Sequence, residues 1–211
     1  MRMGRGELMQ ENPYPSPYQS PAAPSGQPGV LTYDIAYPEH LSRGLIFIKW
    51  LLAIPHFIVL YFLGIVFSIV TFIAWFAILF TGSYPRGLWD FSLMFQRWTA
   101  NVNAYYLLMR DEYPPFAAGP YPVQLDVEYP PRLSRGLIFI KWLLVIPHLI
   151  VIALLGFASF VVLWIVFFAI LFTGKYPRSL WDFMVGFQRW SFRVNLYFNL
   201  MTDVYPPFSL D

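Results

Sequence analysis

The chain has no cysteine among its 211 residues, and charged residues make up only 12% of it. The absence of cysteine excludes a disulfide, a thiolate metal site and a thiol nucleophile. Soluble domains carry about 25% charged residues, so this composition argues against an ordinary soluble domain. The formal net charge of +2 is too small to indicate binding to nucleic acid.

Charge is most depleted in two long stretches of the chain. No Asp, Glu, Lys or Arg occurs at residues 50–81 or 142–174. Apolar runs of about 18 residues or more are typical of membrane spans. Aromatic residues such as Trp50 and Tyr84 flank the first stretch, as is typical of the membrane–water interface. These features predict an all-α integral membrane protein of the cell inner (plasma) membrane, with membrane lipids as its direct partners.

An internal duplication organises most of the chain. A shift of 92 residues aligns residues 37–116 with 129–208 without a gap, and 51 of these 80 positions are identical. Both copies carry charges at matching positions, which predicts tandem parallel repeats rather than inverted ones. We place the two membrane repeats at 30–118 and 122–210. The Pro-rich tail, 1–29, has a composition typical of disorder, and we expect it to be cytoplasmic.

Each apolar block is longer than one membrane span requires. Residues 45–80 would form a helix about 54 Å long at about 1.5 Å per residue, whereas the hydrocarbon core is about 30 Å thick. The block folds either as a helical hairpin that turns near Gly64 (Gly156 in the second copy) or as a kinked helix broken at Pro55 (Pro147). We prefer the hairpin, which makes the protein multi-pass with both ends of each block in the cytoplasm.

Two further elements flank each block. Residues 30–37 and 123–129 alternate apolar and polar side chains, which predicts short strands that pair with each other outside the bilayer. An amphipathic helix follows each block, with its charges on one face. This polar stripe either forms salt bridges that hold the helix to the hairpin or lines a proton or ion path. The charged residues of the stripe are Arg86, Asp90, Arg97, Arg178, Asp182 and Arg189.

Several motifs recur in the same order in both copies, namely LSRGLIFIKWLL, IPH, FAILFTG, YPR, LWDF and YPPF. They resemble a bacterial membrane family, the domain of unknown function DUF4389. The resemblance covers residues 37–116 and 129–208. It implies a bacterial membrane protein with tandem copies and no assigned activity, and it carries over no catalytic residue. The layout of an apolar hairpin followed by an amphipathic helix is also similar to that of reticulon-type curvature proteins.

Two sets of paired residues are candidate sites. His56 and His148 follow the two prolines, and they either ligate one haem iron between the repeats or bond a carbonyl that proline leaves free. A basic set near the start of each block either binds lipid headgroups or extends its charges to the interface. This basic set comprises Lys49, Lys141, Arg43 and Arg135. We predict no metal site.

The sequence contains no nucleophile–base pattern, no HExxH motif and no phosphate-binding loop, so we do not expect an enzyme. The leading hypothesis is a structural or accessory subunit of a larger membrane complex, or a scaffold that shapes the membrane. The alternative is a helical bundle that binds a small molecule, an ion or a haem-type cofactor through the paired His and Asp/Arg positions.

Overall fold

The structure is a computed structural model, and it describes residues 30–117 and 119–211. The tail predicted at residues 1–29 lies outside the described residues. The elements are β1 (Leu31–Ile35), α1 (Lys49–Thr81), α2 (Arg86–Tyr106), β2 (Val123–Val127), α3 (Lys141–Thr173) and α4 (Arg178–Phe198). A short 3-10 helix precedes each long helix, η1 (Leu45–Phe47) before α1 and η2 (Leu137–Phe139) before α3.

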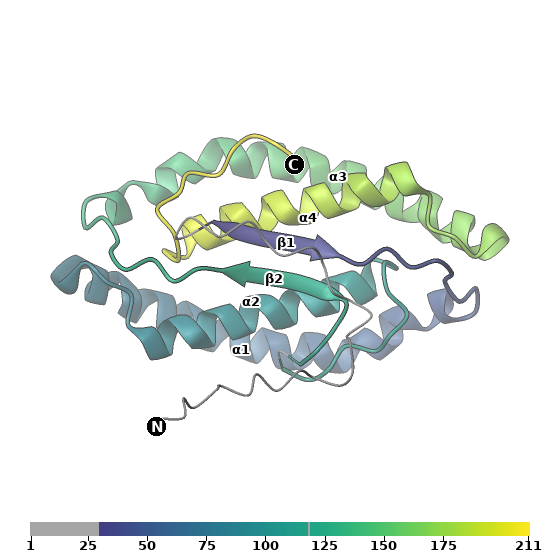
Figure 1. Ribbon diagram of the computed structural model, residues 1–211, viewed down its shortest axis with the longest axis horizontal. Helices are drawn as coiled ribbons and strands as arrows, with labels where there is room; N and C mark the ends of the chain where they lie inside the picture. The colour runs from purple at the N-terminus through teal and green to yellow at the C-terminus, as the bar shows by residue number, and fades with distance from the viewer. Residues whose placement is uncertain (1–29, 118) are drawn as a thin grey trace, which may run out of the picture.

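The elements form a slab of three layers. Along its shortest axis, the two strands lie nearest the viewer, α2 and α4 lie behind them, and α1 and α3 lie farthest back (Figure 1). Helix α1 packs against α2, and α3 packs against α4. The sheet packs on α2 and α4. The amphipathic helices are therefore the middle layer, with the apolar helices on one side and the sheet on the other.

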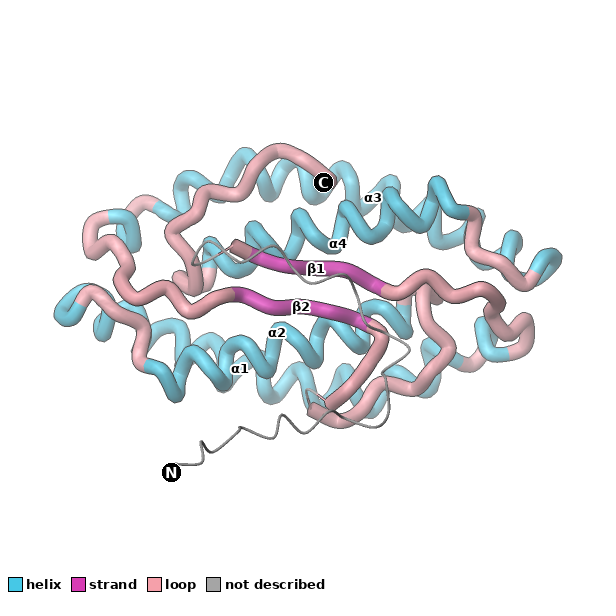
Figure 2. Tube along the Cα trace, viewed as in Figure 1, coloured by secondary structure: helices cyan, strands magenta, loops and turns pink. Residues whose placement is uncertain are grey.

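The predicted strand pairing is confirmed. β1 and β2 form a two-stranded antiparallel sheet in which Tyr33 lies opposite Leu125 (Figure 2). Alternate residues of both strands face the helices and are buried, or partly buried at Val123, whereas Asp34 and Asp126 point away from them and are exposed. The period-two pattern was sufficient to place these strands because one face of the sheet is buried and the other is not.

The two repeats exchange their N-terminal arms, the segments of residues 31–43 and 123–135 that contain β1 and β2. β1 packs on α4 of the second repeat, and β2 packs on α2 of the first. The amide of Leu41 donates to the carbonyl of Gly174 (2.9 Å), and the amide of Leu133 donates to Gly82 (2.8 Å). The Tyr37 hydroxyl donates to the carbonyl of Tyr176, and Tyr129 makes the equivalent bond to Tyr84. Each repeat is thus completed by the strand and arm of the other.

The predicted hairpin at Gly64 is wrong, because α1 and α3 are continuous helices of 33 residues each. Gly64 is not a turn residue. The ring of Phe95 lies 3.8 Å from the position that its Cβ would occupy, so the missing side chain lets α2 approach. Pro55 does not break the helix either. It deletes one backbone hydrogen bond near the start of α1, and the helix continues past it, as it does past Pro147.

A pseudo-twofold axis relates the repeats and runs through the middle of the sheet. The colour gradient shows that α1 and α3 run in opposite directions along the long axis of the slab, as the two strands do (Figure 1). Near each end of the slab, residues at or just before the start of one long helix contact the second half of the other long helix. Trp50 stacks on Phe167 (ring centroids 6.0 Å apart), and Trp75 meets Phe139 edge-on (5.2 Å).

Candidate membrane interface and buried ion pairs

The broad face formed by α1 and α3 is apolar and exposed. Both helices are long and apolar enough to cross a membrane, and their most apolar windows are only 17% and 11% buried. One stripe of α1 is buried, and most of the remaining circumference carries exposed Leu, Ile, Val, Phe and Tyr side chains. The buried stripe consists of Lys49, Ala53, His56, Phe67, Val70, Ala74 and Ile78.

The opposite broad face is polar. Asp34 and Asp126 project from the sheet, and Glu128 follows β2. A groove of about 620 Å³ runs between α2 and β2, and Arg86 and Asp90 contribute to its lining. The slab therefore separates apolar from polar surface across its shortest dimension, with an entire helical layer on the apolar side.

Buried lysine–aspartate ion pairs occupy equivalent places in the two repeats. Lys49 Nζ lies 2.6 Å from Asp111 Oδ1, and the lysine side chain is 0% exposed. The same ammonium donates to the carbonyl of Arg110 (2.8 Å) and lies over the ring of Tyr105. Asp111 Oδ2 accepts the amide hydrogen of Ser42 (2.6 Å). One ion pair thus joins the start of α1, the exchanged arm and the segment after α2.

The second repeat reproduces this arrangement. Lys141 Nζ lies 2.7 Å from Asp203 Oδ1 and donates to the carbonyl of Thr202, and Asp203 accepts from the amide of Ser134. The expectation that Lys49 and Lys141 contact lipid headgroups, or extend to the interface, is therefore wrong. Both ammonium groups point into the protein because a fixed carboxylate and a carbonyl satisfy them there.

The histidines lie in separate aromatic clusters, one in each repeat. Nδ1 of His56 accepts a hydrogen bond from the indole nitrogen of Trp98 (3.1 Å), and Phe116 stacks on the imidazole ring (4.2 Å). His148 has the same relationship to Trp190 and Phe208. A histidine that ligates a metal almost always donates a hydrogen bond from its other ring nitrogen, whereas Nδ1 is an acceptor here. This environment fits a structural histidine and does not fit a haem ligand.

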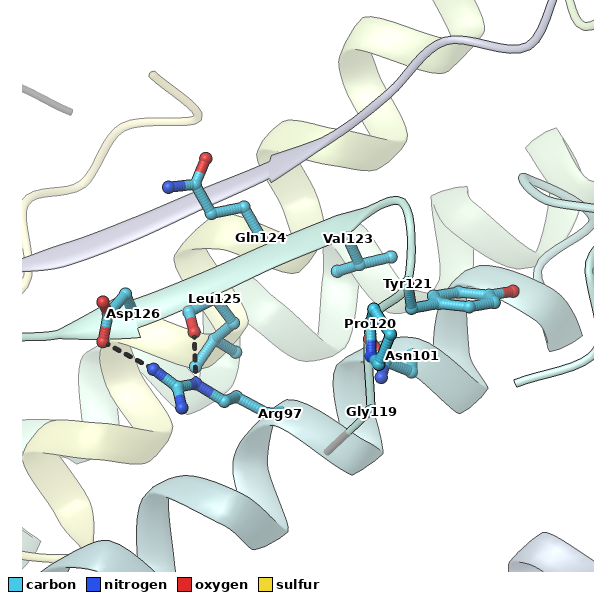
Figure 3. A pocket seen from close by; sticks show the side chains of 9 residues that line it. All are labelled: Arg97, Asn101, Gly119, Pro120, Tyr121, Val123, Gln124, Leu125 and Asp126. Carbon is cyan, nitrogen blue, oxygen red and sulfur yellow. Dashed lines mark hydrogen bonds and ion pairs between the residues drawn. The ribbon is translucent and has the colours of Figure 1, made fainter. Parts of the chain in front are cut away.

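The polar stripe faces the sheet and not the long helix. From α2, Arg97 reaches β2, where Nε donates to the carbonyl of Leu125 (3.0 Å) and Nη2 pairs with Asp126 (2.9 Å) (Figure 3). Arg189 donates in the same way to the carbonyl of Tyr33 (3.1 Å). The stripe therefore holds the exchanged strands on the amphipathic helices. The salt bridges that we expected to the apolar block are not formed by these arginines.

Arg86 and Arg178 lie at the ends of the slab. Each forms an exposed ion pair four residues along its helix, Arg86 with Asp90 (3.2 Å) and Arg178 with Asp182 (3.1 Å). Each guanidinium also lies over a tyrosine ring of the exchanged arm, Tyr129 and Tyr37 respectively. The remaining basic residues of the predicted headgroup set, Arg43 and Arg135, are exposed near the glycines that end α3 and α1.

Sequence reasoning missed the two aspartates of the buried pairs. Asp111 and Asp203 are identical between the repeats, as are Lys49 and Lys141. Retention in both copies does not by itself mark a buried pair, because Arg86 and Asp90 are also retained and are exposed, and the sequence separation hides which charges meet. Among the described residues, no group of three or more His, Asp or Glu side chains is placed to hold a metal ion.

The fold defines a class of protein, a duplicated helical slab with one apolar face. The chain belongs to the family described as Domain of unknown function (DUF4389), whose model matches it twice, at residues 43–118 and 135–209. The resemblance noted from the motifs is thereby confirmed, together with the tandem arrangement. Comparison with curated proteins and with solved structures gives no match.

Proposed function

We propose that this protein is a non-enzymatic membrane scaffold that lies flat in one leaflet, with α1 and α3 immersed among the acyl chains. The observation that carries the proposal is the placement of both apolar helices on one broad face, opposite the polar sheet. A helix is about 10 Å across, which matches the 5–10 Å depth at which interfacial elements enter a leaflet. The sheet then faces water.

An upright orientation fits the slab poorly. The helices and strands share the same long direction, and the sheet lies near the middle of it (Figure 1). If α1 and α3 crossed the bilayer, the open edges of the sheet would lie within the hydrocarbon, where unpaired backbone groups are not tolerated. The Arg97–Asp126 ion pair would lie there too, and each charge at that depth costs about 2.5–3.5 kcal/mol.

Helix length and symmetry support the flat orientation as well. A helix of 33 residues is about 50 Å long, which exceeds the hydrocarbon thickness of about 30 Å but is unrestricted in the membrane plane. With the pseudo-twofold axis along the membrane normal, the two repeats have the same orientation, as their matching charges predict. The exposed arginines at both ends then meet the same leaflet, and the anionic cytoplasmic leaflet of the inner membrane suits them.

The flat slab acts as a wedge. Two long helices add area to the leaflet that contains them and none to the opposite leaflet. A membrane that holds many copies is therefore expected to bend so that the leaflet with the protein is on the convex side. The polar sheet remains free to bind other subunits of a membrane complex. Both roles, membrane shaping and scaffolding, need no catalytic residue.

Topology tests the proposal directly, because the chain has no native cysteine. Gly44 precedes α1, Gly87 follows it and Gly136 precedes α3, and each has open space where a side chain would be added. We expect single-cysteine variants at all three positions to react with a membrane-impermeant maleimide from the same side of sealed vesicles. Upright helices would instead place Gly44 on one side of the membrane and both Gly87 and Gly136 on the other. That result would overturn the proposal.

A vesicle experiment tests the wedge itself. The purified chain, added to large vesicles that contain anionic lipid, is expected to produce tubules or small vesicles visible by electron microscopy. The variant Phe62→Asp introduces a charge on the exposed face of α1, where Phe62 is 61% exposed, and is expected to reduce membrane binding. Asp34→Asn, on the exposed face of the sheet, is the matched control and should bind as the wild type does. Unchanged binding by Phe62→Asp would contradict immersion of α1.

A further inference from the structure

An aromatic hollow opens between the start of α1 and the second half of α3. Its volume is about 220 Å³. It lies on the apolar side of the slab, since Phe160 and Trp164 belong to the exposed surface of α3. Its lining is apolar or aromatic throughout, consisting of Trp50, Tyr106, Phe160, Leu163, Trp164 and Phe167.

Contacts between the repeats fix the walls of the hollow. Trp50 stacks on Phe167 with an angle of 17° between the rings, and Phe47 meets the same ring edge-on (5.3 Å). The indole nitrogen of Trp50 donates to the carbonyl of Tyr106 (3.3 Å). Because the walls are held in this way, an acyl chain that enters the hollow orders few side chains, which lowers the cost of binding.

The pseudosymmetric end of the slab has a different composition at the same places. A shift of 92 residues puts Ser68 where Phe160 stands and Thr71 where Leu163 stands. Two of the apolar wall positions are therefore polar at the other end. The duplication thus supplies an internal control, one end with an apolar hollow and one end whose corresponding positions are partly polar.

Exposed cations lie at the same end of the slab as the hollow. Arg43 Nε lies 3.6 Å from the position that a Cβ of Gly174 would take, and Lys175 follows that glycine. Arg178 lies over Tyr37 of the same arm. From Phe167 to Gly174 is seven residues, about 10 Å along a helix, so a headgroup at the cations can place its acyl chain in the hollow.

Acidic groups at this end do not cancel the positive charge. Asp182 pairs with Nε of Arg178 (3.1 Å), and the arginine side chain remains 64% exposed. Asp111 and Glu112 also lie at this end, but they are paired with Lys49 and Arg110. Glu39 is exposed on the arm. At the other end, Ser83 holds the position of Lys175, but Arg132 holds that of His40 and Pro131 that of Glu39. The two ends therefore carry similar positive charge, and it is the apolar hollow that distinguishes them.

We propose that this end of the slab binds one anionic phospholipid, with its phosphate at Arg43, Lys175 and Arg178 and one acyl chain in the aromatic hollow. Arginine recognises phosphate through two parallel hydrogen bonds, and lysine adds a point charge. The site rests on the proposed flat orientation, which brings the hollow and the cations to the acyl and headgroup levels of one leaflet. It adds a lipid preference to the scaffold.

Native mass spectrometry of the full chain tests the proposal. The protein is delipidated in mild detergent and titrated with phosphatidylglycerol or phosphatidylcholine. We expect one phosphatidylglycerol to remain bound at activation energies that remove phosphatidylcholine. Lys175→Ser should weaken this binding about fivefold, since a basic residue near anionic lipid contributes about 1 kcal/mol. Leu163→Trp should reduce it by filling the hollow, and glycerol phosphate without acyl chains should not compete.

Matched variants at the other end serve as controls. Arg135→Gln and Thr71→Trp are expected to leave the tightly bound lipid in place, and an unchanged thermal midpoint checks that each variant is folded. Equal retention of the two lipids, or full retention in both Lys175→Ser and Leu163→Trp, would overturn the lipid site. Competition by glycerol phosphate would show a site for phosphate alone and would also overturn it. The maleimide experiment is independent of these outcomes, so failure of the lipid site and failure of the flat orientation are distinguishable.

Discussion

Lys49 Nζ lies 2.6 Å from Asp111 Oδ1 in a pair that spans 62 residues of sequence, and Lys141 lies 2.7 Å from Asp203 in the second repeat. The lysines are fully buried, while the aspartates are 26% and 29% exposed. A buried ammonium at the start of an apolar helix has no water to solvate it, so its hydrogen-bond partners must come from the protein. In each repeat, the pair therefore ties the start of the long helix to the segment that follows the amphipathic helix.

Lys49→Met should destabilise the protein by about 3–5 kcal/mol, because it removes one partner of a buried pair and leaves the carboxylate of Asp111 poorly compensated. The double variant Lys49→Met, Asp111→Asn should recover part of this loss, and thermal unfolding in detergent measures both. Arg86→Gln, which breaks an exposed pair, serves as the control and should cost less than about 1 kcal/mol. Equal midpoints for Lys49→Met and the control would show that the pair contributes little.

Cysteines at Asp34 and Gln124 should form a disulfide within one chain. These positions are register partners, and they are a hydrogen-bonded pair, since the carbonyls of Tyr33 and Leu125 face outward to arginines. Their Cα atoms should thus be about 5.5 Å apart, within the range that a disulfide requires. Peptide mapping under non-reducing conditions detects the bond. Asp34→Cys with Asp126→Cys, two residues out of register, should cross-link less, and disulfide-linked dimers would mean that the strands pair between chains.

Gly82→Ala should lower stability by about 1–2 kcal/mol. Gly82 ends α1 at a φ of 75°, a left-handed conformation that costs this much for a residue with a Cβ. The added methyl group would also meet Arg135 Nε at 3.4 Å. Gly174→Ala should act similarly, at a φ of 71°, whereas Gly87→Ala, in open space within α2, should be neutral or stabilising. Thermal midpoints of the three variants give the comparison.

Acid should loosen the first repeat more than the second. Partial burial raises the pKa of the Glu112 carboxyl, but hydrogen bonds from Arg110 outweigh this effect and leave the pKa below its ordinary value of 4.5. Because the folded-state pKa is lowered, the stabilisation is complete above the unfolded pKa and is lost as the pH falls through the folded one. Thermal midpoints between about pH 7 and pH 3 should fall further for the wild type than for Glu112→Gln.

The second repeat provides the reference for this prediction. Thr202 and Val204 occupy the places of Arg110 and Glu112, so it has no equivalent pair to protonate. Hydrogen exchange at low pH should therefore increase at the end of α2 before it increases at the end of α4. A pH profile of Glu112→Gln identical to that of the wild type would show that the pair does not contribute.

The sequence predicted the elements more accurately than their arrangement. The two strands and their pairing follow from alternation, and α2 and α4 follow from a helical charge pattern. The hairpin prediction failed at Gly64 because the sequence does not distinguish a glycine that permits close packing, here with Phe95, from a glycine that turns the chain. Helix length alone could not resolve this, since a helix that lies in the membrane plane, as proposed, need not match the thickness of the bilayer.

The pairing of distant residues was the part that the sequence could not supply. Arg97 was assigned to the right face of its helix, but its partner Asp126 lies in the arm of the other repeat. Exchange of arms between two copies leaves no trace in the periodicity of either copy. In the same way, Lys49 could be seen to lack a local partner, but only the fold brings Asp111 to it.

In the proposed orientation, the polar sheet faces water, and the turns that join α1 to α2 and α3 to α4 lie at the ends of the slab. Insertion from that side then requires no hydrophilic segment to pass through the bilayer. In that orientation, the chain would need no translocation channel for its loops and no membrane potential to orient them. It can complete its fold as it enters the surface, and membrane composition, more than the insertion machinery, would determine where it resides.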